Sequence, residues 1–199
     1  TDPPAAINAE QKQVTAPPKL APEGRFGAAL DPRGLVAHAP HHAAYDARPI
    51  TVECWARVFS RAGFNILVAN ESKESADHWE IYTYAGAGDF SLYLPGCEPA
   101  EIRSGVNIAD GQWHHVAAAF DDTQAKLYVD GKLVQVTPFV RRGRGGPTSP
   151  LWFGGYPPHG LGCDGLVDEV RISNVLRAID GAPKSPLEAD ASTVGLWRF

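Results

Sequence analysis

The sequence predicts an all-β protein built as a two-sheet antiparallel β-sandwich. From Gly24 onward, short apolar runs are separated by Gly, Pro, Asp or Asn every ten or so residues, which is typical of a sandwich. The chain holds 20 glycines and 17 prolines, which favours many turns over long helices. Strands do not alternate with helical segments, so parallel α/β folds are excluded.

The 199 residues suit one sizeable domain preceded by an arm. Residues 1–22 are rich in Pro and Ala and have no sustained apolar period, so they are predicted to be an N-terminal arm or linker. Residues 23–199 are predicted to form the β-sandwich.

Twelve short runs satisfy the strand pattern, because each is apolar and ends near a turn-forming residue. In chain order they are residues 25–30, 34–39, 50–59, 64–70, 78–85, 89–94, 113–120, 125–130, 132–137, 151–156, 165–173 and 193–199. Only residues 174–179 (NVLRAI) are expected to form a short helical turn.

The clearest hairpin signal is KLYVDGKLVQV, where Asp130–Gly131 supplies the positive φ angles of a type I′ turn. A second turn, DDTQ, comes before it. The sequence therefore predicts a three-stranded antiparallel meander from Trp113 to Val136.

Two adjacent histidines, His114 and His115, lie among carboxylates in this meander. Successive side chains of a strand point to opposite faces, so the two rings cannot bind one metal ion. Each is expected to form a hydrogen bond or pack on an aromatic neighbour. In residues 165–172 (GLVDEVRI) the apolar side chains need a core, and one of Asp168 and Glu169 must be paired or solvated.

The net charge of −5 argues against a nucleic-acid-binding protein. The single basic cluster, residues 141–146 (RRGRGG), is interpreted as a mobile solvated loop. Apolar runs fall short of the ~20 residues of a membrane span, so none is predicted.

The three cysteines fit no CxxC pattern. Cys97 and Cys163 both lie in turn-like contexts and are predicted to form a disulfide. Cys54 lies in an apolar strand and is predicted to be a buried thiol. A disulfide would imply an oxidising compartment.

Several motifs in order resemble one known family. The segments ITVECWARV, DGQWHHVAAAFD, KLYVDGKLV and CDGLVDEVRISNVLR resemble the laminin-G-like, concanavalin A-like jelly-roll domains, above all the bacterial LamG-type group, and more distantly the pentraxins. The resemblance covers roughly residues 24–199. It implies a jelly roll, a fold that hosts lectins, glycanases, adhesion modules and spacers.

The sequence offers little that indicates catalysis. Glycanases of the laminarinase type on this fold carry E-x-D-x-x-E on one strand, and that spacing is missing here. The acidic pairs present lie in polar, turn-like stretches where solvated carboxylates are common. There is also no G-x-S-x-G motif. The chain is therefore predicted not to be an enzyme.

The resemblance raises calcium as a cofactor, since some relatives bind it at acidic loops. At the place of the pentraxin metal loop this chain reads GGYPPHGLGCDG, which offers only His159 and Asp164 as side-chain ligands. Calcium takes roughly six to eight oxygens, so that type of site is missing. Asp164 with Asp168 and backbone carbonyls is a weak alternative, and a structural role for both acids is favoured.

Sugar binding usually needs an exposed aromatic ring and a few polar groups. The candidates in loop-proximal positions are Trp79, Tyr84, Trp152 and Tyr156, with His78, His159 and Arg103 beside them. Residues 70–77 (NESKESAD) are expected to form a polar rim. The remaining tryptophans are assigned to packing: Trp55, Trp113 and Trp197.

The predicted function is non-catalytic recognition of a polysaccharide, another glycan or a protein. The chain would be a module of a larger secreted bacterial protein, extracellular or periplasmic, with neighbouring domains. Two alternatives stay open: a concanavalin A-like hydrolase or lyase, which needs two carboxylates facing each other across a groove, and a structural spacer with a flat apolar patch.

Overall fold

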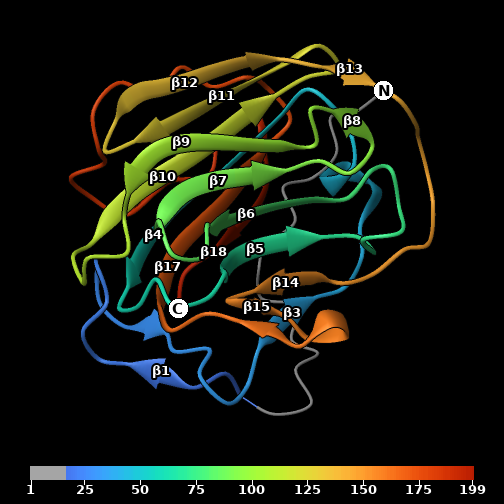
Figure 1. Ribbon diagram of the computed structural model, residues 1–199. Helices are drawn as coiled ribbons and strands as arrows, with labels where there is room; N and C mark the ends of the chain where they lie inside the picture. The colour runs from blue at the N-terminus through green and yellow to red at the C-terminus, as the bar shows by residue number, and fades with distance from the viewer. Residues whose placement is uncertain (1–16) are drawn as a thin grey trace.

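The computed structural model describes residues 17–199, so most of the predicted arm lies outside the described residues. Two large antiparallel sheets pack face to face (Figure 1). Strands β1 and β2 begin the eight-stranded sheet, which runs in the order β1 (Leu20–Ala21), β2 (Ala29–Leu30), β17 (Gly165–Ser173), β4 (Ile50–Val58), β10 (His114–Phe120), β11 (Gln124–Val129) and β12 (Lys132–Pro138). Its last strand, β18 (Thr193–Trp197), pairs with β17.

The six-stranded sheet runs in the order β3 (Ala37–Ala39), β14 (Leu151–Phe153), β5 (Asn65–Asn70), β6 (Trp79–Thr83), β7 (Asp89–Tyr93) and β9 (Glu101–Asn107). Two small sheets pair β8 (Cys97–Glu98) with β13 (Val140–Arg141), and β15 (Gly155–Tyr156) with β16 (Leu161–Gly162). Short 3-10 turns are η1 (Ala43–Tyr45) and η2 (Pro157–His159). The predicted two-sheet sandwich is confirmed.

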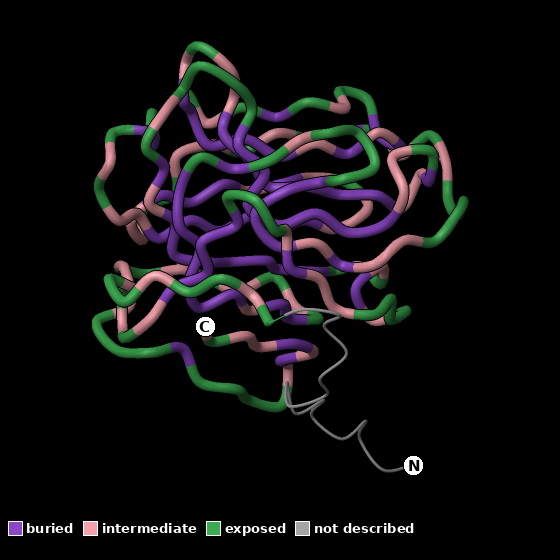
Figure 2. Tube along the Cα trace, turned by 90° about the horizontal axis from the view of Figure 1, so that it is seen from below, coloured by how far each residue is buried: buried purple, intermediate pink, exposed green. Residues whose placement is uncertain are grey.

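The core lies between the two large sheets, where Figure 2 shows the buried residues gathered. Because successive side chains of a strand point to opposite faces of its sheet, every second side chain of a strand points into this core. In β10, Val116, Ala118 and Phe120 face this core, while Ala117 and Ala119 join a small cluster on the other face of the sheet. The period of two expected for this strand is confirmed.

The predicted hairpin is also confirmed, because β11 and β12 meet at Asp130 and Gly131 with φ angles of 51° and 77°. A side chain at Gly131 would clash with the backbone of Gly181, so this position also needs glycine for a close approach.

Strand β17 departs from simple alternation. Glu169 has a φ of 52°, and the register with β4 shifts between Asp168 and Arg171. This bulge lets Val167 and Val170 both reach the core. The two acids are buried, and backbone N–H groups satisfy them: Arg25, Phe26 and Glu169 donate to Asp168, and Leu187 donates to Glu169.

Several predicted elements were wrong. Residues 174–179 contain no helical turn, and residues 25–28 are not a strand. Leu20–Ala21, placed in the arm, form β1 and pair with β2. The predicted strand 151–156 breaks at Gly154, whose φ is 74°. Four further strands were missed: β8, β9, β13 and β16.

The predicted disulfide between Cys97 and Cys163 is also wrong, since all three cysteines are buried free thiols. Cys97 lies beside Arg48, before the start of β4, whereas Cys163 lies beside Gly165, which pairs with Val58 at the end of β4. A nine-residue strand is about 30 Å long, so the two sulfurs are far apart. Burial raises the pKa of Cys163 to about 12 and also raises that of Cys54, so both stay thiols.

The basic segment 141–146 is largely exposed, as a solvated loop would be, but two of its arginines are paired with acidic residues. Arg141 forms ion pairs with Asp77 and Asp122, and Arg144 pairs with Asp122 as well. The backbone N–H of Arg142 donates to the Gly96 carbonyl at 2.7 Å. The acidic partners come from distant parts of the chain, which the local composition does not reveal.

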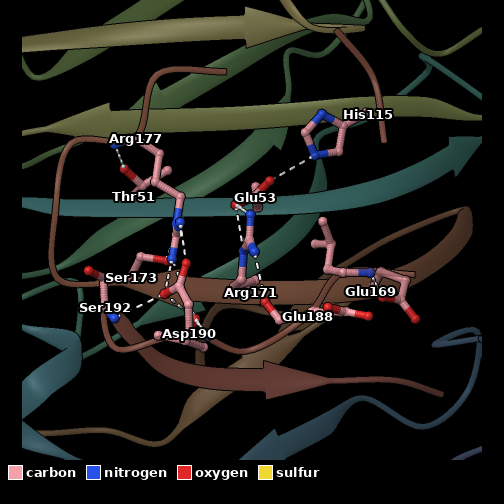
Figure 3. A network of polar contacts seen from close by, with 12 residues as sticks. Thr51, Glu53, His115, Glu169, Arg171, Ser173, Arg177, Glu188, Asp190 and Ser192 are labelled. Carbon is pink, nitrogen blue, oxygen red and sulfur yellow. Dashed lines mark hydrogen bonds and ion pairs between the residues drawn. The ribbon is translucent and has the colours of Figure 1, made fainter. Parts of the chain in front are cut away.

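A polar network on the outer face of the eight-stranded sheet includes His115, one of the two adjacent histidines (Figure 3). Glu53 accepts hydrogen bonds from Arg171 Nε at 2.8 Å and contacts His115 Nε2 at 3.0 Å. The ring of His115 also packs against Trp55. His114 contacts Asp130 and Asp110 instead, so the two histidines serve different carboxylates, as their opposite faces require.

The same network fastens the segment that follows β17 onto the sheet. Arg171 donates to the Glu188 carbonyl at 2.9 Å, and Arg177 forms a two-bond ion pair with Asp190. Arg177 also donates to Ser173. A chain segment with little regular structure is held here by charged hydrogen bonds.

We expect Glu53 to make the protein sensitive to acid. Burial would raise the pKa of Glu53, but the hydrogen bond from His115 and the charge of Arg171 outweigh it and lower the pKa below its ordinary 4.5. The native state then binds fewer protons than the unfolded state, so stability is lost as the pH falls below about 4.5 through the folded-state pKa. Urea unfolding between pH 7 and pH 3 measures this loss. A Glu53→Gln variant that loses stability equally steeply would contradict it.

Candidate ligand-binding groove

The outer face of the six-stranded sheet carries a row of side chains across all its strands. Each residue of the row lies directly opposite the next one on the neighbouring strand, as the register of the paired strands shows. From β3 to β9 the row reads His38, Trp152, Ala69, Glu80, Tyr93 and Glu101. Next to it, Tyr82, Ser91 and Arg103 form a second row.

Alternation in β6 explains which residues reach this face. Trp79 and Ile81 point inward and belong to the main core. Glu80 and Tyr82 therefore point outward. The same rule turns Phe90 and Leu92 of β7 inward and Tyr93 outward.

A groove with a volume of about 480 Å³ lies on this face. Its floor comes from the sheet, and its walls come from the ends of β5 and from the β15–η2–β16 segment. The floor residues are Ile66, Glu80, Tyr82, Tyr93 and Glu101, and the wall residues are Phe64, Lys73, Glu74, His159 and Leu161.

The β15–η2–β16 segment is held to the opposite wall by Tyr156. This side chain is 1% exposed and packs with Ile66, Ala69 and Tyr82. Its hydroxyl accepts a hydrogen bond from the Lys73 N–H at 3.0 Å. Tyr156 therefore shapes the groove from below rather than offering its ring to a ligand.

The two carboxylates of the floor differ in their surroundings. Glu80 is buried, with Lys73 Nζ 2.8 Å from one oxygen and His78 Nε2 3.5 Å from the other. Burial alone would raise the pKa of Glu80, but these two contacts outweigh it and lower the pKa. Glu101 is exposed and accepts a hydrogen bond from the Tyr82 hydroxyl at 3.3 Å.

The aromatic surface continues beyond the groove at Tyr84. The Arg103 guanidinium lies 3.8 Å from the centre of the Tyr84 ring, a cation–π contact. Arg103 is held there by two hydrogen bonds to Asp89, at 3.0 and 2.6 Å. Phe64 packs edge-on against Tyr84.

The five residues predicted to bind a ligand differ in burial and location. His159 lines the groove, and Tyr84 and Trp152 lie half-buried on the same face beside it. Tyr156 is buried, so its choice as an exposed ring was wrong. Trp79 was also wrong: it is 1% exposed in the core, where its Nε1 donates to the Tyr45 carbonyl at 2.8 Å.

Sequence reasoning missed the residues that form most of the groove: Lys73, Glu80, Tyr82, Tyr93 and Glu101. A signal was available in residues 78–85 (HWEIYTYA). Trp79 and Tyr84 are five residues apart, so a strand places them on opposite faces. With Trp79 in the core, Glu80 and Tyr82 would have been the residues to choose.

The weak calcium alternative at Asp164 and Asp168 does not fit the structure. Three backbone N–H donors surround the Asp168 carboxylate, which leaves little room for a cation. Asp164 lies four residues earlier, about 13 Å away along an extended chain. Its own N–H donates to Asn65 Oδ1.

A second cavity of about 730 Å³ shares Phe64 and Leu161 with the groove. Phe64 is its one aromatic lining residue among those described, and its Arg33 is already paired with Asp31. The groove over the sheet is therefore the better candidate for recognition. Among residues 17–199, no helix is long and apolar enough to cross a membrane.

Comparisons with known proteins agree with this architecture. The family model Laminin_G_3, described as the concanavalin A-like lectin/glucanases superfamily, matches residues 34–179. Domain 4 of AbnA, an extracellular GH43 arabinanase from Geobacillus stearothermophilus in complex with arabinotriose, is 17% identical with a TM-score of 0.58, covering 79% of this chain and 75% of that one.

Two further solved structures are similar. The CBM40 of a Ruminococcus gnavus IT-sialidase, bound to α2,3-sialyllactose, is 13% identical with a TM-score of 0.55, covering 71% of this chain and 90% of that one. A heptameric SAP-like pentraxin from Limulus polyphemus is 17% identical with a TM-score of 0.50, and 66% of each chain is covered, just under two thirds. At these identities the likeness shows the fold alone.

Proposed function

The chain belongs to the concanavalin A-like lectin/glucanase superfamily, and from this premise we propose that it is a non-catalytic module that binds a neutral polysaccharide in the groove. The observation that carries the proposal is the groove itself, with its aromatic floor and polar walls. Binding sites for small ligands are concave and mostly apolar, with a few polar groups placed around them.

Tyr93 is the ring best placed for stacking on a sugar. It is half-buried, whereas Tyr82 beside it is 3% exposed and supports the floor. Lys73 Nζ lies 5.4 Å from the centre of the Tyr93 ring, where it can donate to sugar hydroxyls. Glu101 and His159 supply further polar contacts along the groove.

The charge of the groove favours neutral sugars. Lys73 neutralises Glu80, which leaves Glu74 and Glu101 as exposed carboxylates, with His159 3.7 Å from Glu74. Sialic acids and uronic acids would be repelled by these charges. Of the two glycan-bound relatives, the arabinotriose complex is thus the closer guide to ligand chemistry.

Hydrolysis is the second candidate function, because Glu80 and Glu101 both flank Tyr93 in one row. Their backbones are two strand spacings, about 9.5 Å, apart, with Tyr93 between them, and a glycosidase uses a pair of carboxylates that flank the bond it cleaves. A glycosidase, however, needs one carboxylic acid with a raised pKa, and the pKa of Glu80 is lowered. The proposal therefore favours binding without cleavage.

We also propose that the module works outside the cytoplasm, within a larger secreted protein. The support is the Geobacillus relative, one domain of an extracellular enzyme. A disulfide would have supported a location outside the cytoplasm, but the three cysteines are free thiols and give no such support.

A Tyr93→Ala variant tests the groove. We expect it to weaken binding of the preferred neutral polysaccharide about tenfold, which corresponds to about 1.4 kcal/mol for one stacking ring. The ligand is first chosen on an array of neutral, sialylated and uronate-containing glycans, and affinity is then measured by calorimetry.

Phe59→Ala is the matched control, because Phe59 is an exposed aromatic that lines neither cavity. Equal losses for both variants would argue against the groove. Binding confined to sialylated glycans would contradict the charge argument. Release of reducing sugar that disappears in Glu101→Gln would favour the hydrolase, and silence on every glycan would favour a protein ligand or a spacer.

A further inference from the structure

A second cluster of polar side chains lies at the end of β5, outside the groove. His41 and Asp46 flank the η1 turn, and Glu71 directly follows β5. One nitrogen or oxygen atom from each of the three side chains lies within 4.8 Å of the other two. Segments about 30 residues apart in the sequence thus bring an imidazole and two carboxylates together.

Glu71 is built into this cluster. Its side chain is only 2% exposed, and its backbone has a φ of 67°, a left-handed conformation that is unfavourable for glutamate. Oε2 accepts a hydrogen bond from the Ser149 N–H at 3.1 Å. Oε1 is buried, accepts no hydrogen bond of normal geometry, and lies in ion-pair contact with His41 Nδ1 at 2.5 Å.

Asn70 borders the cluster and fixes one of its carboxylates. The residue is fully buried, and its Nδ2 donates hydrogen bonds to Asp46 Oδ1 at 2.6 Å and to the Tyr45 carbonyl at 3.3 Å. Asp46 therefore enters the cluster in a defined position.

Two carboxylates at one place favour a positive charge between them. The imidazole of His41 is the one basic side chain in the cluster. A divalent cation would satisfy both carboxylates and could take an imidazole nitrogen as a further ligand.

We propose that His41, Asp46 and Glu71 form a binding site for a divalent transition-metal cation. One imidazole nitrogen with carboxylate oxygens is a ligand set that suits zinc. Calcium would need roughly six to eight oxygens, more than these residues offer. Ligand atoms bonded to a tetrahedral zinc ion at about 2.0–2.1 Å are about 3.3 Å apart, whereas these three lie within 4.8 Å of one another, so side-chain shifts of about 1–2 Å would form the site.

The site has a structural consequence for the groove. Glu71 begins the segment that continues to Lys73 and Glu74 in the groove wall, and His78 Nδ1 contacts the Glu71 carbonyl at 3.0 Å. A bound cation would fix the start of this wall. Metal binding itself does not depend on what the groove recognises.

The test is binding of Zn²⁺ alone to the full chain after treatment with chelator. We expect Zn²⁺ at a hundredfold excess over its Kd to raise the Tm by about 5–10 °C, with Ca²⁺ having a much smaller effect. Calorimetry gives the affinity. His41→Gln, at a ring with 35% of its side chain exposed, should fold normally and weaken Zn²⁺ binding by at least about tenfold.

Glu71→Gln should weaken binding similarly, and His159→Gln is the control, since it removes an exposed histidine from another part of the protein. If Glu71→Gln fails to fold, His41→Gln decides. Absence of a Tm shift and of binding heat would overturn the proposal and leave the contact between His41 and Glu71 as the role of both side chains. Zn²⁺ binding that is unchanged in His41→Gln, or lost equally in His159→Gln, would overturn it as well.

Discussion

Replacing Glu53 with glutamine is expected to lower the free energy of unfolding by about 3–5 kcal/mol. Glu53 is 1% exposed and lies between Arg171 and His115, so its loss leaves the Arg171 charge inside the sheet face without a carboxylate. The Arg171 contact to the Glu188 carbonyl, which holds the segment after β17, weakens with it. Urea unfolding at pH 7 measures the change.

The matched control is Glu188→Gln, which removes the same charge from an exposed side chain. It should change the free energy of unfolding by less than about 0.5 kcal/mol. Similar stability of the two variants would mean that the buried carboxylate contributes no more than a surface charge does.

Replacing Trp79 with alanine is expected to lower the free energy of unfolding by about 3–5 kcal/mol. The indole fills the core between the sheets, packs edge-on against Phe120, and donates its N–H to the Tyr45 carbonyl. Removing it leaves both a cavity and an unpaired buried carbonyl. Chemical unfolding followed by circular dichroism measures the loss.

Trp152→Ala is the control, since this indole is half-buried on the outer face beside the groove. Its loss should be about 1–2 kcal/mol, because less apolar surface leaves the solvent when Trp152 packs. A Trp79→Ala variant that stayed stable but no longer bound glycan would contradict the core position and restore Trp79 as a ligand contact.

The strands show how far local pattern carries a prediction. The alternation in residues 113–120 and the Asp130–Gly131 turn identified β10, β11 and β12, and the alternation also gave the two faces of β10. Edge strand β9 was missed, because its sequence EIRSGVN mixes charged and polar residues with glycine. An edge strand pairs with a neighbour on one side only and tolerates such residues, so its composition does not identify it.

The groove depends on contacts that the local sequence pattern does not predict. Period two alone would place Glu80, Tyr82 and Tyr93 outward on their strands. That Glu101 joins them depends on β9 pairing with β7, and that Lys73 faces them depends on its contact with Tyr156 from a segment some 80 residues away. Neither of these two contacts follows from the sequence pattern around the residues that form it.

The fold class, most strands, the meander and the family can be predicted from the sequence, because turn residues and side-chain alternation act over a few neighbouring residues. The structure was needed to show that Cys97 and Cys163 lie apart, that Trp79 is buried, and that the outward residues of four strands form one groove. These outcomes depend on strand order and register, which long-range packing of the two sheets selects.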